Sequence, residues 1–167
     1  MNLNQYQKKS QKSESSEDRA RKYALKLLSY RGRSVKELQE RLRIKGFSDH
    51  EISSVINYLQ HINLINDRLL AEELRTKLIK AKLLSQKSAK KIMNMRGIPK
   101  EIIDNILTFD ETEDRENAKK LIQKKVISLK NYPVEKIKKK LHDLLLRKGY
   151  SYETINVVLK EINLKEE

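Results

Sequence analysis

One pattern occurs three times along this chain of 167 residues, and the repetition constrains its fold more than any other feature. A helical run of apolar residues leads to a glycine at positions 46, 97 and 149, and a second apolar run follows each glycine. The separations of 51 and 52 residues let the apolar positions on both sides be superimposed. Tandem repeats of this kind are typical of stacked supersecondary units, which present a long surface rather than one deep pocket. We therefore expect function to reside on a surface.

The apolar residues follow helical spacing almost throughout, and no segment alternates convincingly with the two-residue period of a strand. The sequence therefore predicts an all-α fold of three tandem three-helix repeats, forming an elongated, curved molecule. The predicted helices are 17–30, 34–45 and 48–61, then 67–83, 85–96 and 99–108, then 112–129, 134–148 and 151–163. The predicted repeats are 17–61, 62–110 and 111–167, behind a disordered tail of residues 1–16 that is nearly free of apolar groups.

Local chemistry marks where these helices begin and end. Ser34 and Ser48 each precede a glutamate by three residues, which is the capping-box pattern of a helix start. Gly46, Gly97 and Gly149 each follow a cation and precede an apolar residue. We interpret them as one helix ending used three times, with the glycine in the left-handed conformation and the cation facing the negative end of the helix dipole.

The chain is strongly basic, with a formal net charge of +14 and an isoelectric point near 9.8. Each of the segments 17–61, 62–110 and 111–167 carries four more basic than acidic residues, so the charge is spread over all three repeats. Such a field attracts polyanions and favours nucleic acid as a partner, although a merely solvated basic surface is the alternative. No apolar run is long enough to span a bilayer, and there is no cysteine. We expect a monomeric, cytoplasmic protein without a membrane partner.

The sequence contains no pattern of a catalytic or ligand site. The four glycines form neither a Walker loop nor a dinucleotide fingerprint, and the histidines at 50, 61 and 142 lack metal-binding spacing. The acidic run between Glu111 and Glu116 lies at a predicted helix start, where it complements the helix dipole. We therefore predict no catalytic residue, no cofactor and no metal.

The candidate binding residues are basic and lie on or beside the middle helix of each repeat, where they would form a ridge if the repeats stack in register. Only arginine offers a planar fork to phosphate or carboxylate, so the first repeat is expected to contribute the most oriented contacts. Its arginines lie mostly off the apolar stripe, which predicts that reversing their charge alters binding but hardly alters stability. The candidates are Arg31, Arg33, Arg41, Arg43 and Lys45, then Lys87, Lys90, Lys91 and Arg96, then Lys136, Lys138, Lys139, Lys140, Arg147 and Lys148.

Two segments resemble the signature of a known family. Residues 31–38, Arg-Gly-Arg-Ser-Val-Lys-Glu-Leu, fit the R-x-R-S-x-x-E-L pattern of the RecX family of bacterial recombination regulators, and residues 67–71 approach its D-x-x-[FY]-A motif. The resemblance extends over about residues 17 to 163 and is most specific in the first repeat. Leu70 replaces the usual aromatic residue, and Asn63 replaces a common glycine.

The resemblance implies a non-enzymatic protein that binds the RecA–single-stranded DNA filament and limits the recombinase, ATPase and co-protease activities of RecA in recombination, repair and the SOS response. It would place the basic candidates against RecA or DNA, with weak, non-specific binding to DNA alone. The main alternative is a sequence-specific helix-turn-helix transcription regulator, because two helices joined by a short turn resemble that motif. A small nuclease is a third option, disfavoured because no catalytic constellation is present.

Overall fold

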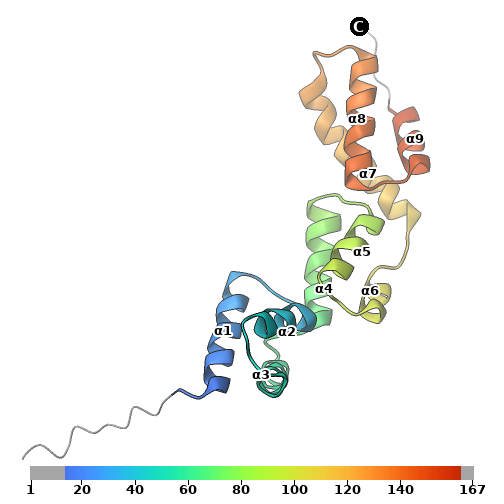
Figure 1. Ribbon diagram of the computed structural model, residues 1–167. Helices are drawn as coiled ribbons and strands as arrows, with labels where there is room; N and C mark the ends of the chain where they lie inside the picture. The colour runs from blue at the N-terminus through green and yellow to red at the C-terminus, as the bar shows by residue number, and fades with distance from the viewer. Residues whose placement is uncertain (1–13, 163–167) are drawn as a thin grey trace, which may run out of the picture. The chain divides into compact units, whose positions relative to one another are not determined.

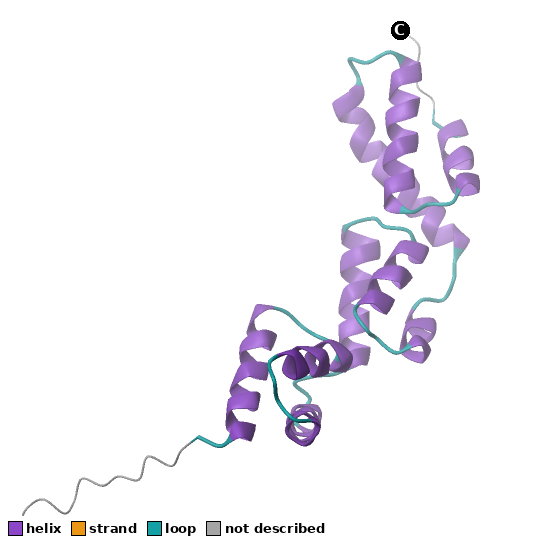
Figure 2. Cartoon of the chain, in the orientation of Figure 1, coloured by secondary structure: helices purple, strands orange, loops and turns teal. Residues whose placement is uncertain are grey.

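Residues 14–162 are described in a computed structural model, and in this range the chain consists of helices and turns without a strand (Figures 1 and 2). The predicted all-α fold is therefore confirmed for this part of the chain. Residues 1–13 of the predicted tail lie outside the described residues. The side chain of Ser15 accepts a hydrogen bond from the amide of Asp18, and the first helix begins at Ser16, one residue before the predicted start.

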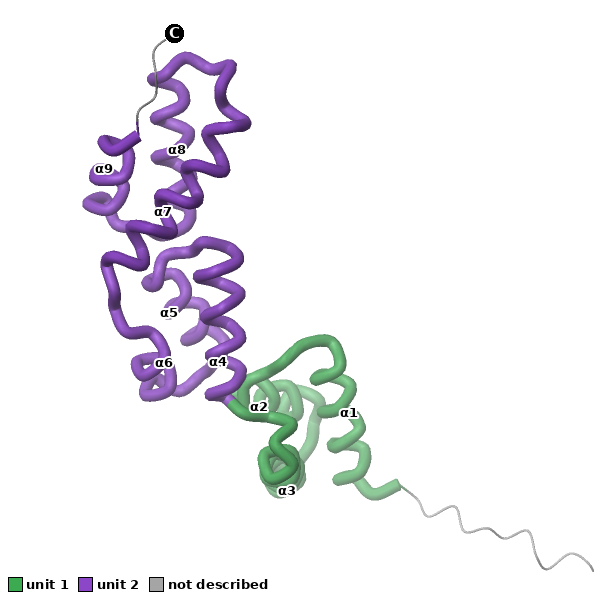
Figure 3. The backbone as a smooth tube through the Cα atoms, turned by 180° about the vertical axis from the view of Figure 1, so that it is seen from behind, with its two compact units in different colours: residues 1–66 green, residues 67–167 purple. Residues whose placement is uncertain are grey.

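The chain divides into two compact units, one ending at Asn66 and the other beginning at Asp67 (Figure 3). The first unit has one core, in which Leu38 and Leu42 pack with Val55 and Leu59, all with no exposed surface. The capping boxes predicted at Ser34 and Ser48 are both present. The helices of this unit are α1 (Ser16–Tyr30), α2 (Val35–Ile44) and α3 (Asp49–His61).

The second unit contains two further groups of three helices, each with its own hydrophobic core. Met93 and Ile103 lie in the first of these cores, and Leu141 and Ile155 lie in the second. The first group comprises α4 (Asp67–Arg75), the π-helical segment η1 (Thr76–Ala81), α5 (Gln86–Met95) and α6 (Lys100–Ile106). The second comprises α7 (Glu111–Val126), the short 3₁₀ segment η2 (Ile127–Leu129), α8 (Val134–Lys148) and α9 (Tyr152–Lys160).

The three predicted glycine turns are confirmed, and all have the same hydrogen bonds. Gly46, Gly97 and Gly149 have φ angles of 94°, 70° and 84°. In each turn the residue after the glycine donates its amide to a carbonyl five residues earlier, as in the bond of 3.2 Å from Tyr150 to Leu145. The glycine donates to a carbonyl three residues earlier. This pair of bonds is the Schellman motif, which requires a left-handed residue at the position of the glycine.

The helix predicted over 67–83 is not uniform. It is α-helical to Arg75 and then widens into the π-helical η1, where the amide of Lys82 bonds to the carbonyl of Lys77 over 3.0 Å. The wider turn keeps both Leu78 and Ile79 buried. Leu83, two residues after the end of η1, has a φ of 50° although it has a side chain. A prediction that assumes a uniform helical period of 3.6 residues does not reveal this local change of helical pitch.

Within the second unit, the end of α8 meets the start of α5 through polar contacts (Figure 1). The amide of Ser85 donates to the carbonyl of Lys148 over 3.1 Å, and its hydroxyl donates to the carbonyl of Gly149 over 2.7 Å. The hydroxyl of Tyr150 donates to the carbonyl of Leu83, and burial raises the pKa of this phenol well above its usual range. The two helix groups are thereby joined by directed bonds between residues more than 60 positions apart.

Two carboxylates add to this junction from α7. Arg75 donates two hydrogen bonds, of 3.0 and 2.9 Å, to Glu113, and both side chains are largely buried. Asp114 accepts the amide of Gln86 over 3.0 Å, while burial raises the pKa of its carboxyl group. Both acids belong to the run that the sequence assigned to a helix start, and they also bind the preceding helix group.

Candidate functional site

The charges of the described helices are unequally divided between the middle and the last helix of each group. The middle helix α8 carries six basic and two acidic residues, and α5 carries three basic residues and no acid. The last helices are poorer in cations, because α3 has two acids and neither lysine nor arginine, and α6 has one lysine and two acids. A polyanion would therefore be attracted more strongly to the middle helices than to the last helices, and most strongly to α8.

The arginines at the corner between α1 and α2 make contacts within the protein. Arg31 donates two hydrogen bonds to the carboxylate of Glu37, of 3.0 and 2.9 Å, and this ion pair raises the pKa of the guanidinium. Arg33 donates to the backbone carbonyl of Leu27, near the end of α1, over 3.2 Å. These bonds give the R-x-R-S-x-x-E-L segment a structural meaning, because its arginines fasten α1 to the capped start of α2, while Leu38 enters the core.

The other first-group candidates differ in how they are held. Arg43 pairs with Asp49 over 3.0 Å at a well exposed site. The ammonium of Lys45 lies 5.8 Å from the ring centre of Tyr23. Arg41 is exposed and makes no hydrogen bond or ion pair with the described residues. Of these three cations, only Arg43 has a neutralising partner in residues 14–162, while Arg41 and Lys45 have none.

The candidates of the second helix group also include both paired and exposed, unpaired cations. Lys90 forms an ion pair with Asp104 of α6 and lowers the pKa of that carboxyl group through this bond. Arg96 is half-buried at the end of α5. Lys87 and Lys91 are exposed, stand four residues apart on one side of α5, and bind no side chain among the described residues.

In the third helix group, Lys138 forms an ion pair of 3.3 Å with Glu135, and Lys148 donates to the carbonyl of Lys82 over 2.7 Å. Lys139 and Arg147 are exposed and have no such partner within the described range. The ammonium groups of Lys136 and Lys140 both lie 5.0 Å from the ring centre of Tyr132. Four cations without a hydrogen-bonded or ionic partner among the described residues therefore lie on α8, namely Lys136, Lys139, Lys140 and Arg147.

The sequence reasoning missed two residues that resemble these candidates. Lys36 is exposed, and the repeat register places it in the same position of α2 as Lys87 in α5 and Lys139 in α8. Superposing the repeats would have found it. Tyr132 precedes α8 in a turn, and only its spacing of four and eight residues from Lys136 and Lys140 could have indicated the ring contacts.

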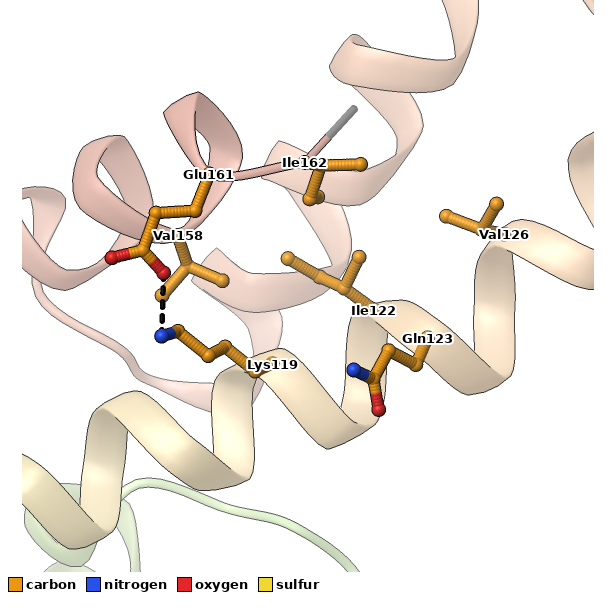
Figure 4. A pocket seen from close by; sticks show the side chains of 7 residues that line it. All are labelled: Lys119, Ile122, Gln123, Val126, Val158, Glu161 and Ile162. Atoms are coloured by element: carbon orange, nitrogen blue, oxygen red, sulfur yellow. Dashed lines mark ion pairs between the residues drawn. The ribbon is translucent and has the colours of Figure 1, made fainter. Parts of the chain in front are cut away.

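A separate groove of about 440 Å³ lies between α7 and α9 (Figure 4). Its walls are mainly aliphatic, with Ile122 and Val126 on α7 facing Val158 and Ile162. At one edge the ammonium of Lys119 pairs with Glu161 over 2.6 Å. This groove brings together no nucleophile and base, and residues 14–162 contain no group of three side chains suited to hold a metal ion. Nor is any helix in that range long and apolar enough to cross a bilayer.

Tandem three-helix domains with a strong net positive charge on the middle helices α5 and α8 are suited to binding through a surface. The family model described as RecX, first three-helix domain, matches residues 20–59, and the one described as RecX, third three-helix domain, matches residues 112–159. The regulatory protein RecX of Clostridium botulinum is 32% identical over 148 residues, which cover 86% of this chain and 68% of that protein. The counterpart from Chlorobaculum tepidum is 32% identical over 83% of this chain and 84% of its own length.

A solved structure agrees with these sequence matches. The crystal structure of RecX from Lactobacillus salivarius superimposes with a TM-score of 0.68 and 28% identity, covering 89% of this chain and 97% of that one. The chain therefore belongs to the RecX family of regulatory proteins. The resemblance that the sequence suggested is confirmed.

Proposed function

We propose that this protein binds the RecA–single-stranded DNA filament and lowers the recombinase, ATPase and co-protease activities of RecA. The observation that carries the proposal is the net positive charge of the middle helices α5 and α8, each with exposed, unpaired lysines, in a RecX-family chain. A protein filament formed on single-stranded DNA offers phosphate groups, which such a charge attracts. Several weak contacts on one chain strengthen each other by raising the effective concentration of the next.

The charge of the last helices argues against a sequence-specific transcription regulator. In a helix-turn-helix protein the second helix of the motif enters the major groove between two rows of phosphates. The corresponding helices here are α3, α6 and α9, and α3 begins with Asp49 and Glu51 and has no lysine or arginine. Acidic side chains at that place would be repelled by the DNA backbone.

The proposal is tested by titrating the full-length protein into the cognate RecA on single-stranded DNA while ATP turnover is measured. We expect turnover to fall at amounts well below one molecule per RecA protomer, and we expect filaments to shorten in electron micrographs. Unchanged turnover and filament length at saturating protein would refute the proposed function. A duplex binding assay against random sequence would test the transcription-regulator alternative, which requires a preferred site.

A further inference from the structure

The start of α8 holds a cluster of like charges around one aromatic ring. The turn before the helix is fixed by a bond of 3.0 Å from the amide of Tyr132 to the carbonyl of Leu129. Tyr132 is 40% exposed, and the ammonium groups of Lys136 and Lys140 both lie 5.0 Å from the centre of its ring. Lys139, one position before Lys140, is also exposed. We call Tyr132, Lys136, Lys139 and Lys140 the α8 cluster.

The α8 cluster has no counter-ion among the described residues. The nearest acids along the helix are Glu135, which pairs with Lys138, and Asp143, which lies 3.6 Å from a ring nitrogen of His142. Two ammonium groups held against one ring repel each other, and the quadrupole of the ring offsets only part of this repulsion. An anion bound beside the two ammonium groups would offset this repulsion, so the arrangement is suited to a negatively charged ligand.

The C-terminal ends of the other middle helices differ from the C-terminal end of α8. The repeat register aligns Ile44 of α2 and Met95 of α5 with Arg147 of α8, and these two apolar residues are 78% and 69% exposed. Exposed Met or aliphatic side chains beside cations are suited to a protein partner, whereas phosphate requires charge throughout. Among the middle helices, α8 therefore fits a nucleic-acid backbone best.

We infer that the α8 cluster binds the phosphates of a nucleic-acid backbone, and that Tyr132 is a positioning residue that holds Lys136 and Lys140 for this contact. The inference deepens the proposed function, on which it rests, by naming the ligand of one helix within the filament. The ring of Tyr132 is already in contact with both ammonium groups. The proposed contact therefore recognises the charge of the phosphates and has little preference among the bases.

The test measures the anisotropy of a labelled single-stranded oligonucleotide of mixed sequence, with the full-length protein and without RecA. Replacing Lys136 and Lys140 by Gln should weaken binding about tenfold at low salt. It should also reduce the slope of log affinity against log salt concentration by about 1.4, since each lost contact to a single-strand phosphate removes about 0.7 from that slope. Tyr132→Leu should weaken binding about threefold, whereas Tyr132→Phe, which keeps the ring, should bind like the wild type.

The matched control is the double variant Lys87→Gln, Lys91→Gln, which removes two exposed lysines four residues apart on α5, where there is no such ring contact in residues 14–162. It should keep most of the oligonucleotide affinity and the salt slope.

Equal losses in both double variants, or wild-type binding by Tyr132→Leu, would overturn the inference. An α8 variant that loses the RecA filament but keeps the oligonucleotide would also overturn it, because its partner would then be protein. If the wild-type protein lowers RecA turnover yet binds no oligonucleotide, the inference fails while the proposed function stands. If it binds the oligonucleotide through the α8 cluster but leaves RecA turnover unchanged, the proposed function fails and the inference stands.

Discussion

The arginines of the first helix group and the lysines of α8 are similar in the sequence but differ in the structure. Arg31 and Arg33 are bound to Glu37 and to the carbonyl of Leu27, so they hold α1 against α2. Lys136 and Lys140 meet only the ring of Tyr132 and carry no neutralising partner within residues 14–162. A dense set of basic residues can therefore serve either the fold or a partner, and the carboxylates within reach distinguish the two uses.

The comparison also explains why each residue type stands where it does. The planar fork of Arg31 makes two parallel bonds to one carboxylate, which a lysine cannot do. Glu37 serves twice, since it also completes the capping box with Ser34. For the proposed phosphate contact of α8 a point charge suffices, because a lysine can pair with phosphate without the planar, two-bond geometry of a guanidinium group.

The largest expected difference between the first helix group and the region of α8 concerns the glycine turn that occurs in both. A β-carbon added at Gly149 would overlap the hydroxyl of Ser88 and lie 3.0 Å from that of Ser85, whereas one added at Gly46 meets nothing within 4 Å. We expect Gly149→Ala to cost about 3–5 kcal/mol, from left-handed strain plus overpacking, and Gly46→Ala about 1–2 kcal/mol from strain alone. Urea titrations of both variants would measure the difference. Equal losses would mean that the junction between α5 and α8 is looser than described.

A smaller effect is expected at the corner between α1 and α2. Arg31→Ala should lower the free energy of unfolding by about 1 kcal/mol, because it breaks a bidentate pair whose carboxylate is only 17% exposed. The sequence alone predicted almost no loss at this position. Lys139→Ala on α8 is the matched control and should leave stability unchanged. A double-mutant cycle of Arg31→Ala with Glu37→Gln would contradict this reading if the two effects simply added.

The smallest effect is the pH dependence that Glu51 adds to the stability of the first unit. Hydrogen bonds from Ser16 and Ser48 lower the pKa of Glu51 from 4.5 to about 2. A carboxylate with a lowered pKa stabilises the fold above its unfolded pKa, and this contribution is lost as the pH falls from about 4.5 to about 2. The corresponding position of the third group is Thr154, which does not titrate in this range. Melting curves of the wild type and Glu51→Gln should therefore converge at low pH, and a constant difference would contradict the assignment.

Most of the secondary structure could be predicted because its signals are local. The glycine turns and the boxes at Ser34 and Ser48 each depend on residues within about six positions, and the structure confirms them. The left-handed Asn63, by contrast, was seen only as a replacement for a common glycine. It closes α3 with the same bonds as the glycine turns, since Leu64 donates to Leu59 over 2.8 Å.

The side-chain pairing of the candidate surface could not be predicted in the same way. A count of cations does not reveal that Glu37 faces Arg31, that Asp104 faces Lys90, or that Lys148 reaches a carbonyl 66 residues away. These contacts depend on how helices pack, which the apolar period fixes only to within a helix face. Binding by the candidate residues stays a prediction. The candidates that remain available for it are the cations without a partner among the described residues.

The most direct test of the central claim is co-sedimentation with the RecA–single-stranded DNA filament, using two variants that reverse equal charge. One replaces Lys136, Lys139 and Lys140 of α8 by Glu, and the other replaces Lys120, Lys124 and Lys125 of α7, which are also exposed. Both should remain folded by circular dichroism, since exposed charges contribute little to stability. We predict that the α8 variant is largely lost from the pellet while the α7 variant sediments like the wild type. Equal retention of the two variants, or equal loss, would contradict the claim that α8 contacts the filament.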